Sequence, residues 1–362
     1  MLYKVIGVMS GSSLDGLDVV FTELQEAGGV WTFEIKAADC VPYNKLWEHK
    51  LQNAVNLSAK DYLLLHSDYG RYIAQSINEF IDRNNLHHQV NLISSHGHTT
   101  FHLPKNKMTH QLGDGSAIAA DTHLSVVSDL RALDVAFGGE GAPIVPLGEK
   151  LLFGDYDYFL NIGGIANVSI KLENEVFAFD VCAANRVLNL LANEKGLDYD
   201  DGGEISSKGI VNQPLLEQLN ELEYYKQRPP KSLANSFGTD FIYPFIKSFG
   251  LSVEDNLRTY TEHICIQIKN CLQLYKKDSF QKLFITGGGV FNNFLITRLA
   301  ENLEEINFEI VIPGEEVVKY KEALIMALLG VLRWREQFTV LASVTGASQN
   351  SIGGALWLGT EA

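Results

Sequence analysis

Hydrophobic and polar residues follow two different periods along this chain, and each period predicts one kind of element. Short apolar runs rich in β-branched residues predict strands over residues 2–8, 17–24 and 31–38. Apolar residues at helical spacing follow over residues 44–54 and 59–83. The chain is therefore expected to open with a three-stranded meander that is followed by helices.

Shorter elements complete this first part. Ser58 precedes the second of these helices and belongs to the residue types that cap helix N-termini. Residues 90–94 and 125–128 predict two more strands, with an Ala-rich helix ending near His123 between them. The predicted order of elements is thus β-β-β-α-β-α-β.

The second part of the chain repeats this order. The two copies agree in the spacing of their elements and only weakly in residue identity. Residues 196–256 interrupt the second copy, and we interpret them as an inserted region of loops and a short helix. The pattern predicts strands over residues 156–162, 168–172, 176–181, 282–286 and 308–312, and helices over residues 185–193, 257–275, 292–303 and 317–337.

Length and repeat together predict two domains. The chain has 362 residues, which fits two domains of ordinary size. The first predicted domain comprises residues 1–128 together with about 340–362, and the second comprises residues 129–339 with the inserted region. A composition of 46% hydrophobic and 20% charged residues is ordinary for a globular protein with a large core.

Charge and cysteine content exclude several classes of partner. The net charge of -15 repels nucleic acid and anionic lipid surfaces, so we expect neither nucleic acid nor a membrane as a partner. No apolar run reaches the roughly 20 residues that span a bilayer, and we see no signal peptide. Cys40, Cys182, Cys265 and Cys271 form no Cys-x-x-Cys pair, which favours a reducing cytoplasm.

The first candidate site is the turn between the first two strands. Its glycines and hydroxyls can direct several N–H and O–H donors to one point, which predicts an anion cradle, most naturally for phosphate. The two aspartates of the turn suit phosphate only with a divalent cation or a water between them. A plain turn is the alternative interpretation. The segment consists of Gly11, Ser12, Ser13, Leu14, Asp15, Gly16, Leu17 and Asp18.

Two further glycine turns follow predicted strands. Gly163 and Gly164 come after the first strand of the second copy, so two hairpin turns are available to hold a polyphosphate. Gly287 and Gly288 lie between a strand and a helix N-terminus, which suits the sugar and base of a nucleotide. Each turn alone is also explained as a plain turn, but the three in this order favour nucleotide binding.

These three turns resemble the phosphate and adenosine motifs of the actin, hexokinase and sugar-kinase superfamily. Residues 8–16, 138–143 and 343–349 resemble, more specifically, the anhydro-N-acetylmuramic acid kinase family, and the similarity covers essentially the whole chain. The resemblance implies an α/β fold of two actin-like (ribonuclease H-like) β-β-β-α-β-α-β domains with a nucleotide cleft between them. It also implies a possible homodimer.

The reaction implied by the resemblance uses ATP and Mg²⁺. Water adds at the anomeric carbon of 1,6-anhydro-N-acetylmuramic acid while the γ-phosphoryl passes to O6. The product is N-acetylmuramic acid 6-phosphate, in cell-wall recycling. The partner implied is therefore a small-molecule amino sugar.

The catalytic base implied by the resemblance is Asp180. The chemistry needs a group that takes a proton from the attacking water, and a carboxylate is the simplest choice. Asp180 ends the predicted strand over residues 176–181. Without the resemblance, an aspartate there is more often the N-cap of the next helix. A base in a closed, partly dry cleft is expected to have a raised pKa, which separates the two interpretations.

Four residues are assigned to the sugar. Glu322 matches a family glutamate near the sugar, although a solvated glutamate on an amphipathic helix is the alternative. Asn185 matches the asparagine of the motif that follows the catalytic aspartate, and Arg131 remains from an arginine triplet suited to the lactyl carboxylate. His96 lies in a polar stretch expected just past a strand end, where open α/β sheets bind ligands.

Three departures from the family pattern fall on this sugar side. Residues 181–184 are Val-Cys-Ala-Ala where the family has Thr-Gly-Pro-Gly, and alanine replaces glycine only where φ is negative. Only Arg131 remains of the arginine triplet, and residues 231–237 lack a Thr-Gly-Arg-Glu run. The phosphate motifs match closely, with Ser12 for the usual threonine.

The metal ligands and the acceptor stay open at this point. His96 and His98 have a spacing found in metal sites, but no cysteine or carboxylate completes a recognisable set, so we favour hydrogen-bonding roles. Mg²⁺ is implied by phosphoryl transfer and not by these histidines. The alternatives to the implied reaction are a kinase for a different amino sugar and a nucleotide-dependent binding or chaperone-like protein.

Overall fold

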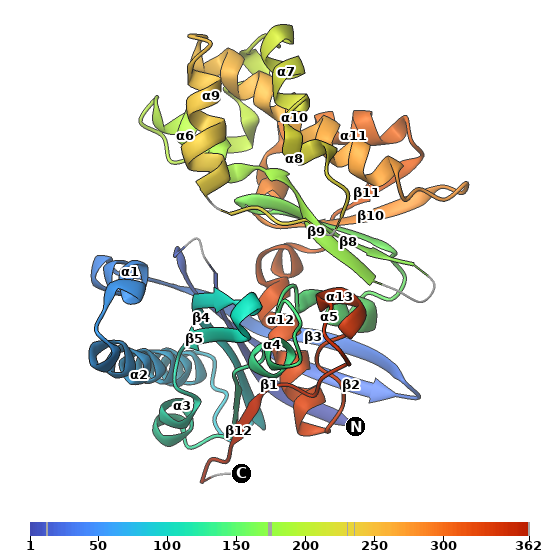
Figure 1. The fold of residues 1–362 in the computed structure, drawn as a ribbon. Coiled ribbons are helices and arrows are strands. Elements are labelled where there is room, and N and C mark those ends of the chain that lie inside the picture. The colour runs from blue at the N-terminus through green and yellow to red at the C-terminus, as the bar shows by residue number, and fades with distance from the viewer. Residues whose placement is uncertain (12–13, 173–175, 230, 235, 361–362) are drawn as a thin grey trace. The chain divides into compact units, whose positions relative to one another are not determined.

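A computed structural model describes residues 1–362 except 12–13, 173–175, 230, 235 and 361–362 (Figure 1). The chain forms two compact units, one from Met1–Gly154 and Tyr320–Ala362 and the other from Asp155–Lys319. Each unit contains one mixed sheet with helices packed on it. The predicted α/β class is therefore confirmed.

The boundaries of the units differ from the predicted ones near 128 and 340. Helix α5 contacts strand β3, and the ring of Phe153 lies 5.4 Å from that of Phe33. The part of α12 from Tyr320 on packs on strand β1, where a Cβ at Gly7 would lie 2.0 Å from the carbonyl oxygen of Ala323. These contacts place both segments in the first unit, and the sequence pattern did not reveal them because they join residues far apart in the chain.

The first unit contains a seven-stranded sheet in the order β12-β6-β4-β1-β2-β3, with β5 paired to β4. Strands β1, β2 and β3 form the predicted antiparallel meander, while β4 lies parallel to β1 and β6 parallel to β4. The strands are β1 (Leu2–Ser10), β2 (Gly16–Ala27), β3 (Val30–Pro42), β4 (Leu92–Leu103), β5 (Met108–Leu112), β6 (Val126–Ser128) and β12 (Ala355–Trp357).

Helices cover both faces of this sheet. The face of β1 that carries Ile6 and Val8 packs on Ile73 and Ile77 of α2, and the opposite face packs on α12. Ser58 caps α2 as predicted, because its side chain accepts a hydrogen bond from the backbone N–H of Asp61. The helices of this unit are α1 (Lys45–Gln52), α2 (Ala59–Arg83), α3 (Gly115–Thr122), α4 (Ala132–Ala136), α5 (Val145–Leu152), α13 (Ala342–Thr345) and most of α12 (Glu315–Trp334).

The second unit contains a five-stranded sheet in the order β11-β10-β7-β8-β9. The order of strands along the chain is the same as for β6-β4-β1-β2-β3 of the first unit, so both copies of β-β-β-α-β-α-β are confirmed. The elements are β7 (Tyr158–Ile162), β8 (Ile165–Lys171), β9 (Val176–Ala183), α6 (Asn185–Asn193), α10 (Val253–Gln273), β10 (Gln281–Thr286), α11 (Asn293–Glu304) and β11 (Phe308–Val311).

The end of β9 is fixed by the core of this unit. Tyr260 of α10 is fully buried, and its hydroxyl donates a hydrogen bond of 2.8 Å to the carbonyl oxygen of Ala183.

The region predicted as an insertion carries more helix than expected. It contains α7 (Gln213–Asn220), α8 (Glu223–Lys226), α9 (Tyr243–Lys247), the 3₁₀ turns Asp201–Gly203 and Ser206–Lys208, and the π-helical segment Phe237–Ile242.

Two predicted turns are shorter than expected. Strand β4 continues to Leu103, so His96 lies inside the strand and not past its end, because β5 pairs with the second half of β4. Strand β8 begins at Ile165, which limits the glycine turn to Gly163 and Gly164. The first correction places His96 within a strand, and the second leaves Gly163 and Gly164 as a tight turn between two strands.

Candidate active site

The turn between β1 and β2 carries the first group of candidates. Ser12 and Ser13 lie outside the described residues, whereas Gly11 and residues 14–18 are described. Leu14 has a positive φ of 60°, and the N–H of Gly16 donates to Oδ1 of Asp15 at 3.1 Å. Leu17 pairs with Ser10 where strands β1 and β2 meet the turn, and its side chain is fully buried. Leu17 therefore contributes its backbone and its packing in the core.

Asp18 lies at the base of this turn, opposite Met9 of β1 and Cys40 of β3. The pKa of its carboxyl is raised to about 7, chiefly by burial and to a lesser extent by the nearby carboxylates of Asp15 and Glu322, while a hydrogen bond with Cys40 opposes the change. The charges of Asp15 and Glu322 therefore both act on Asp18. A cation beside Asp18 would favour its ionised form.

His96 and Arg131 form a hydrogen-bonded pair. Nδ1 of His96 lies 2.8 Å from the carbonyl oxygen of Gly97, and its Nε2 accepts from Nε of Arg131 at 2.8 Å. These partners assign a neutral imidazole with its proton on Nδ1. Burial and the Arg131 charge lower the pKa of His96 to about 3. Since both ring nitrogens are occupied, the predicted hydrogen-bonding role is confirmed.

Arg131 is also anchored to the loop that follows it. Its Nη1 donates to the carbonyl oxygen of Gly141 at 2.6 Å, and the N–H of Gly141 donates to Oδ2 of Asp134 at 2.8 Å. The hydroxyl of Thr345 donates to the other oxygen of this fully buried Asp134 at 2.7 Å. Asp134 thereby joins the segments 138–143 and 343–349, which the sequence motifs identified separately.

Glu322 lies on α12 beside this pair. It is half-buried, and burial raises the pKa of its carboxyl, whereas the charges of Lys321 and Arg131 lower it. Lys321 forms a buried ion pair of 2.7 Å with Glu149 of α5. Glu322 is therefore not a freely solvated glutamate. Asp18, His96, Arg131 and Glu322 come together in the first unit.

Asp180 lies inside β9 of the second unit. One carboxylate oxygen accepts from the N–H of Leu233 at 2.8 Å, and the hydroxyl of Tyr224 donates to the Asp180 carbonyl oxygen at 2.8 Å. Burial raises the pKa of Asp180, and the bond from Leu233 partly opposes this. The N-cap of α6 is Ala184, so the interpretation of Asp180 as a helix cap is wrong.

The Gly163–Gly164 turn is tied to the start of α6. The N–H groups of Asn185 and Arg186 donate to the carbonyl oxygens of Gly163 and Gly164 at 3.1 and 3.3 Å. The side-chain amide of Asn185 donates to the carbonyl oxygen of Ile162 at 3.1 Å. Ala184 has a negative φ of -130°, which explains how alanine replaces a family glycine there.

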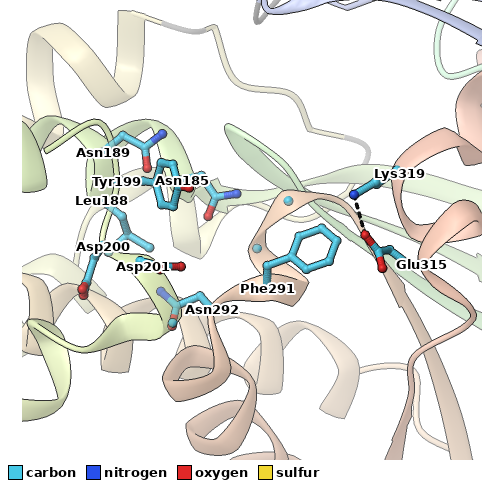
Figure 2. Close-up of a pocket in the computed structure, with 13 residues that line it drawn as sticks. Asn185, Leu188, Asn189, Tyr199, Asp200, Asp201, Phe291, Asn292, Glu315 and Lys319 are labelled. Carbon is cyan, nitrogen blue, oxygen red and sulfur yellow. Dashed lines mark hydrogen bonds and ion pairs between the residues drawn. The ribbon is translucent and has the colours of Figure 1, made fainter. Parts of the chain in front are cut away.

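A pocket of about 470 Å³ opens beside this helix (Figure 2). Asn185 and Gly288 line it. Figure 2 shows Asn185 together with side chains from the rest of α6, from the loop that follows α6 and from α12. The acidic stretch after α6 lines this pocket too, with Asp200 anchored to the backbone N–H groups of Ile205 and Ser206. The lining residues are Asn185, Leu188, Asn189, Tyr199, Asp200, Asp201, Gly202, Gly288, Gly289, Phe291, Asn292, Glu315 and Lys319.

Gly287 and Gly164 have different reasons to be glycine. Gly287 has a φ of 89°, and a Cβ there would lie 2.5 Å from Oδ1 of Asn161 and 2.8 Å from the carbonyl oxygen of Ile162. A Cβ at Gly164 would meet its nearest atom at 3.5 Å, an ordinary contact, and its φ is not positive. The fold requires glycine at position 287 and not at 164.

We therefore expect Gly287→Ala to lower the free energy of unfolding by about 2–4 kcal/mol, from backbone strain and overpacking together. Gly164→Ala is the matched control and is expected to change it by less than about 0.5 kcal/mol. Urea unfolding of the two variants measures the difference. Equal stability of Gly287→Ala and wild type would show that the backbone relaxes at this position.

Comparison with known proteins relates these features to a family. The family model described as anhydro-N-acetylmuramic acid kinase matches residues 3–359. The chain belongs to the anhydro-N-acetylmuramic acid kinase family. The kinase of this name from Francisella tularensis subsp. novicida (strain U112) is 32% identical, over 97% of this chain and 97% of the relative. Those from Bacillus cereus and Haemophilus influenzae are each 32% identical, over 96% and 97% of this chain and 97% of each relative.

Membership of the anhydro-N-acetylmuramic acid kinase family makes the chain a sugar kinase, a phosphotransferase that uses a nucleotide and a small-molecule sugar. This outcome favours the kinase over the chaperone-like alternative. In the part of the chain that the structure describes, no helix is long and apolar enough to cross a membrane. The same residues contain no group of three or more His, Cys, Asp or Glu side chains arranged to hold a metal ion.

Proposed function

We propose that the protein opens 1,6-anhydro-N-acetylmuramic acid with water and phosphorylates it with ATP. The oxygen of water bonds to the anomeric carbon, the bond from that carbon to O6 breaks, and O6 takes the γ-phosphoryl group. The proton of the water passes to a carboxylate, and ADP leaves. The product is N-acetylmuramic acid 6-phosphate, which places the enzyme in cell-wall recycling.

The observation that carries this proposal is the half-buried position of the Asp180 carboxyl. This carboxyl has a pKa raised by burial, which suits a general base that works near neutral pH. Asp180 lies three residues before Ala183, which pairs with Ile165 directly after the Gly163–Gly164 turn. The base therefore lies about 10 Å or less along the strands from the turn proposed to hold phosphate.

The nucleoside is proposed to occupy the pocket beside α6. Tyr199 and Phe291 both line it and are 59% and 46% exposed, so their rings are available to a base. Stacking of a base on such a ring contributes about 1–3 kcal/mol. Asn185 lines the same pocket, and we assign it to the border between nucleotide and sugar.

Mg²⁺ fits the carboxylates at the β1–β2 turn. The oxygens of Asp15 and Asp18 are ligands of the type that Mg²⁺ prefers, and a cation there would offset the burial and the neighbouring negative charges that raise the pKa of Asp18. When bound, the ion would supply positive charge that offsets the charge of the phosphates during transfer. Gly11 and Gly16 are proposed to bring the backbone close to the phosphates.

The sugar is proposed to meet the cluster of Arg131, Glu322 and His96. The guanidinium of Arg131 uses two of its five N–H donors on His96 and Gly141, which leaves donors for the lactyl carboxylate. Glu322 is proposed to accept from a sugar hydroxyl. The neutral His96 holds Arg131 in place without adding charge to it.

Transfer of label from γ-labelled ATP to a panel of sugars tests the proposal. The panel holds anhydro-N-acetylmuramic acid, N-acetylmuramic acid, N-acetylglucosamine and glucosamine, each with and without Mg²⁺. We expect Mg²⁺-dependent transfer to the anhydro sugar alone. Transfer only to another amino sugar would contradict the proposed acceptor. The acceptor is the most informative point to test, because residues 181–184 and the single Arg131 differ from the family pattern on the sugar side.

The acid limb of the pH profile tests the role of Asp180. Leu233→Pro removes the N–H that lowers the pKa of Asp180, so this pKa is expected to rise. A base must be ionised, so kcat falls as pH falls through this pKa, and the acid limb should move to higher pH by about one unit. Leu233→Ala keeps the N–H and serves as the control. An unchanged limb in Leu233→Pro would exclude Asp180 as the titrating base.

Two expectations from the sequence, the compartment and the oligomeric state, stay predictions. The four cysteines are free thiols, which fits the proposed cytoplasmic location. Sedimentation of the purified protein measures whether it forms the expected homodimer.

A further inference from the structure

Arg186 is a cation without a hydrogen-bond or ion-pair partner for its side chain among the described residues. It is the second residue of α6 and is half-buried. Its Nε is buried and has no hydrogen-bond partner, and no ion pair joins it to any of the described residues. Arg258 also has an unpaired buried Nε, but its Nη2 pairs with Glu262 at 3.2 Å and its guanidinium lies 4.8 Å above the ring of Phe294.

The guanidinium of Arg186 lies over the Gly163–Gly164 turn. A Cβ built on Gly164 would lie 3.5 Å from Nε and 3.6 Å from Nη2 of Arg186. On another side, a Cβ on Gly238 would lie 3.8 Å from Cδ of Arg186. The side chain is thus held between two glycines, and its buried donor faces no acceptor in the described part of the chain. Buried donors are nearly always paired, so an external anion is the expected partner.

The glycines of the turn leave space beside this cation. Neither Gly163 nor Gly164 has a positive φ, and a Cβ at either position would make only ordinary contacts, the nearest at 3.5 Å. Backbone conformation and packing therefore do not require glycine at either position. A side chain at Gly164 would instead occupy the space next to the guanidinium, where a ligand has access.

The donors of the helix backbone are not available for that ligand. The N–H groups of Asn185 and Arg186 already donate to the carbonyl oxygens of the turn. Among the described residues, the Arg186 side chain offers a buried donor without a hydrogen-bond partner at this point. A guanidinium binds phosphate oxygens through two parallel N–H bonds.

We propose that Arg186 binds the terminal phosphate of the bound nucleoside triphosphate. This assignment rests on the proposed function, in which the nucleoside occupies the pocket lined by Asn185 and Gly288. Arg186 follows Asn185 in the chain and contacts the turn next to β8, whose partner strand carries Asp180. The guanidinium therefore lies at a turn that leads into the strand pair carrying Asp180, on the helix that also contributes Asn185 to the nucleoside pocket, and the phosphoryl group to be transferred is assigned to this turn.

Calorimetric titration with ATP, ADP and AMP, each with Mg²⁺ and without sugar, tests this assignment. Arg186→Gln is expected to weaken ATP binding about 10- to 100-fold, the loss of a charge-assisted hydrogen bond or pair, and to leave AMP binding unchanged. Arg186→Lys keeps the charge but not the two-pronged geometry and should lie between the two. Lys208→Gln removes one exposed positive charge from the same unit and should change neither affinity.

Three results would overturn the assignment. Equal losses for ATP and AMP in Arg186→Gln would indicate a structural role, and thermal unfolding of the variant would show the same. Unchanged nucleotide binding with a raised KM for the anhydro sugar would make the sugar carboxylate the partner. Unchanged values throughout would leave Arg186 without a ligand role. If wild type transfers nothing to the anhydro sugar while Arg186→Gln still loses the preference for ATP, the proposed function fails and the assignment of Arg186 stands.

Discussion

Replacing Asp180 by asparagine is expected to lower kcat for phosphorylation of the anhydro sugar by about 10²–10⁴-fold, the usual contribution of a general base. An amide keeps the shape of the side chain and still accepts from the N–H of Leu233, but it takes no proton from water. Nucleotide affinity should stay within about twofold of wild type, because a base that acts on water need not contact the nucleotide. Stopped assays for kcat and calorimetry for ATP binding measure the two quantities.

Asp157→Asn is the matched control for this experiment. Asp157 belongs to the same unit, and its carboxylate pairs with Lys171 and Lys277 near the protein surface. Removing that charge should leave kcat unchanged. If Asp180→Asn retains near wild-type turnover, another group accepts the proton and the proposed mechanism is wrong.

Arg131→Leu is expected to raise KM for the anhydro sugar by about 10- to 100-fold, because a hydrogen bond to a charged group contributes about 1.5–3 kcal/mol. The same change leaves Nε2 of His96 and the carbonyl oxygen of Gly141 without their donor. The free energy of unfolding should therefore fall by about 1–3 kcal/mol. Nucleotide affinity should be unaffected, since Arg131 belongs to the first unit and all residues that line the nucleoside pocket belong to the second.

Arg71→Leu controls for the loss of an exposed arginine in the same unit, since Arg71 pairs with Asp121 at the surface. Arg131→Lys adds a second comparison, because lysine keeps the charge and loses the fork that reaches His96 and Gly141 together. A KM that is unchanged in Arg131→Leu would remove Arg131 from the sugar site. Steady-state kinetics with each variant at saturating ATP decide between these outcomes.

The parts of the fold that could be predicted from the sequence are those with a local signal. The meander β1–β3 and helix α2 have long runs with one period, and Ser58 marks the start of α2 to the residue. Strands β5 and β12 were missed because they are short and their pairing partners lie outside the segment itself. The unit boundaries were misplaced for the same reason, since packing of α5 and α12 on the first sheet is a long-range contact.

The candidate site divides in a similar way. Glycine turns are local features, so their positions could be predicted from the sequence. Why glycine is required at position 287 and not at 164 depends on the surrounding atoms, which only the structure shows. The placement of Asp18, Arg131 and Glu322 near one another depends on three distant elements. Arg186 carried no signal, because one arginine at a helix start is common in any sequence.

The first unit is built from both ends of the chain, and this has a consequence for its biosynthesis. Residues Asp155–Lys319 form the second unit without interruption, so it has all its residues before the last segment is translated. The first unit must wait for β12 and Thr345, which reaches Asp134 across 211 residues of sequence. Contacts between residues so far apart form slowly. A ribosome that stalls before the final segment would therefore release a chain whose second unit can fold, while its first unit still exposes an unpaired sheet edge.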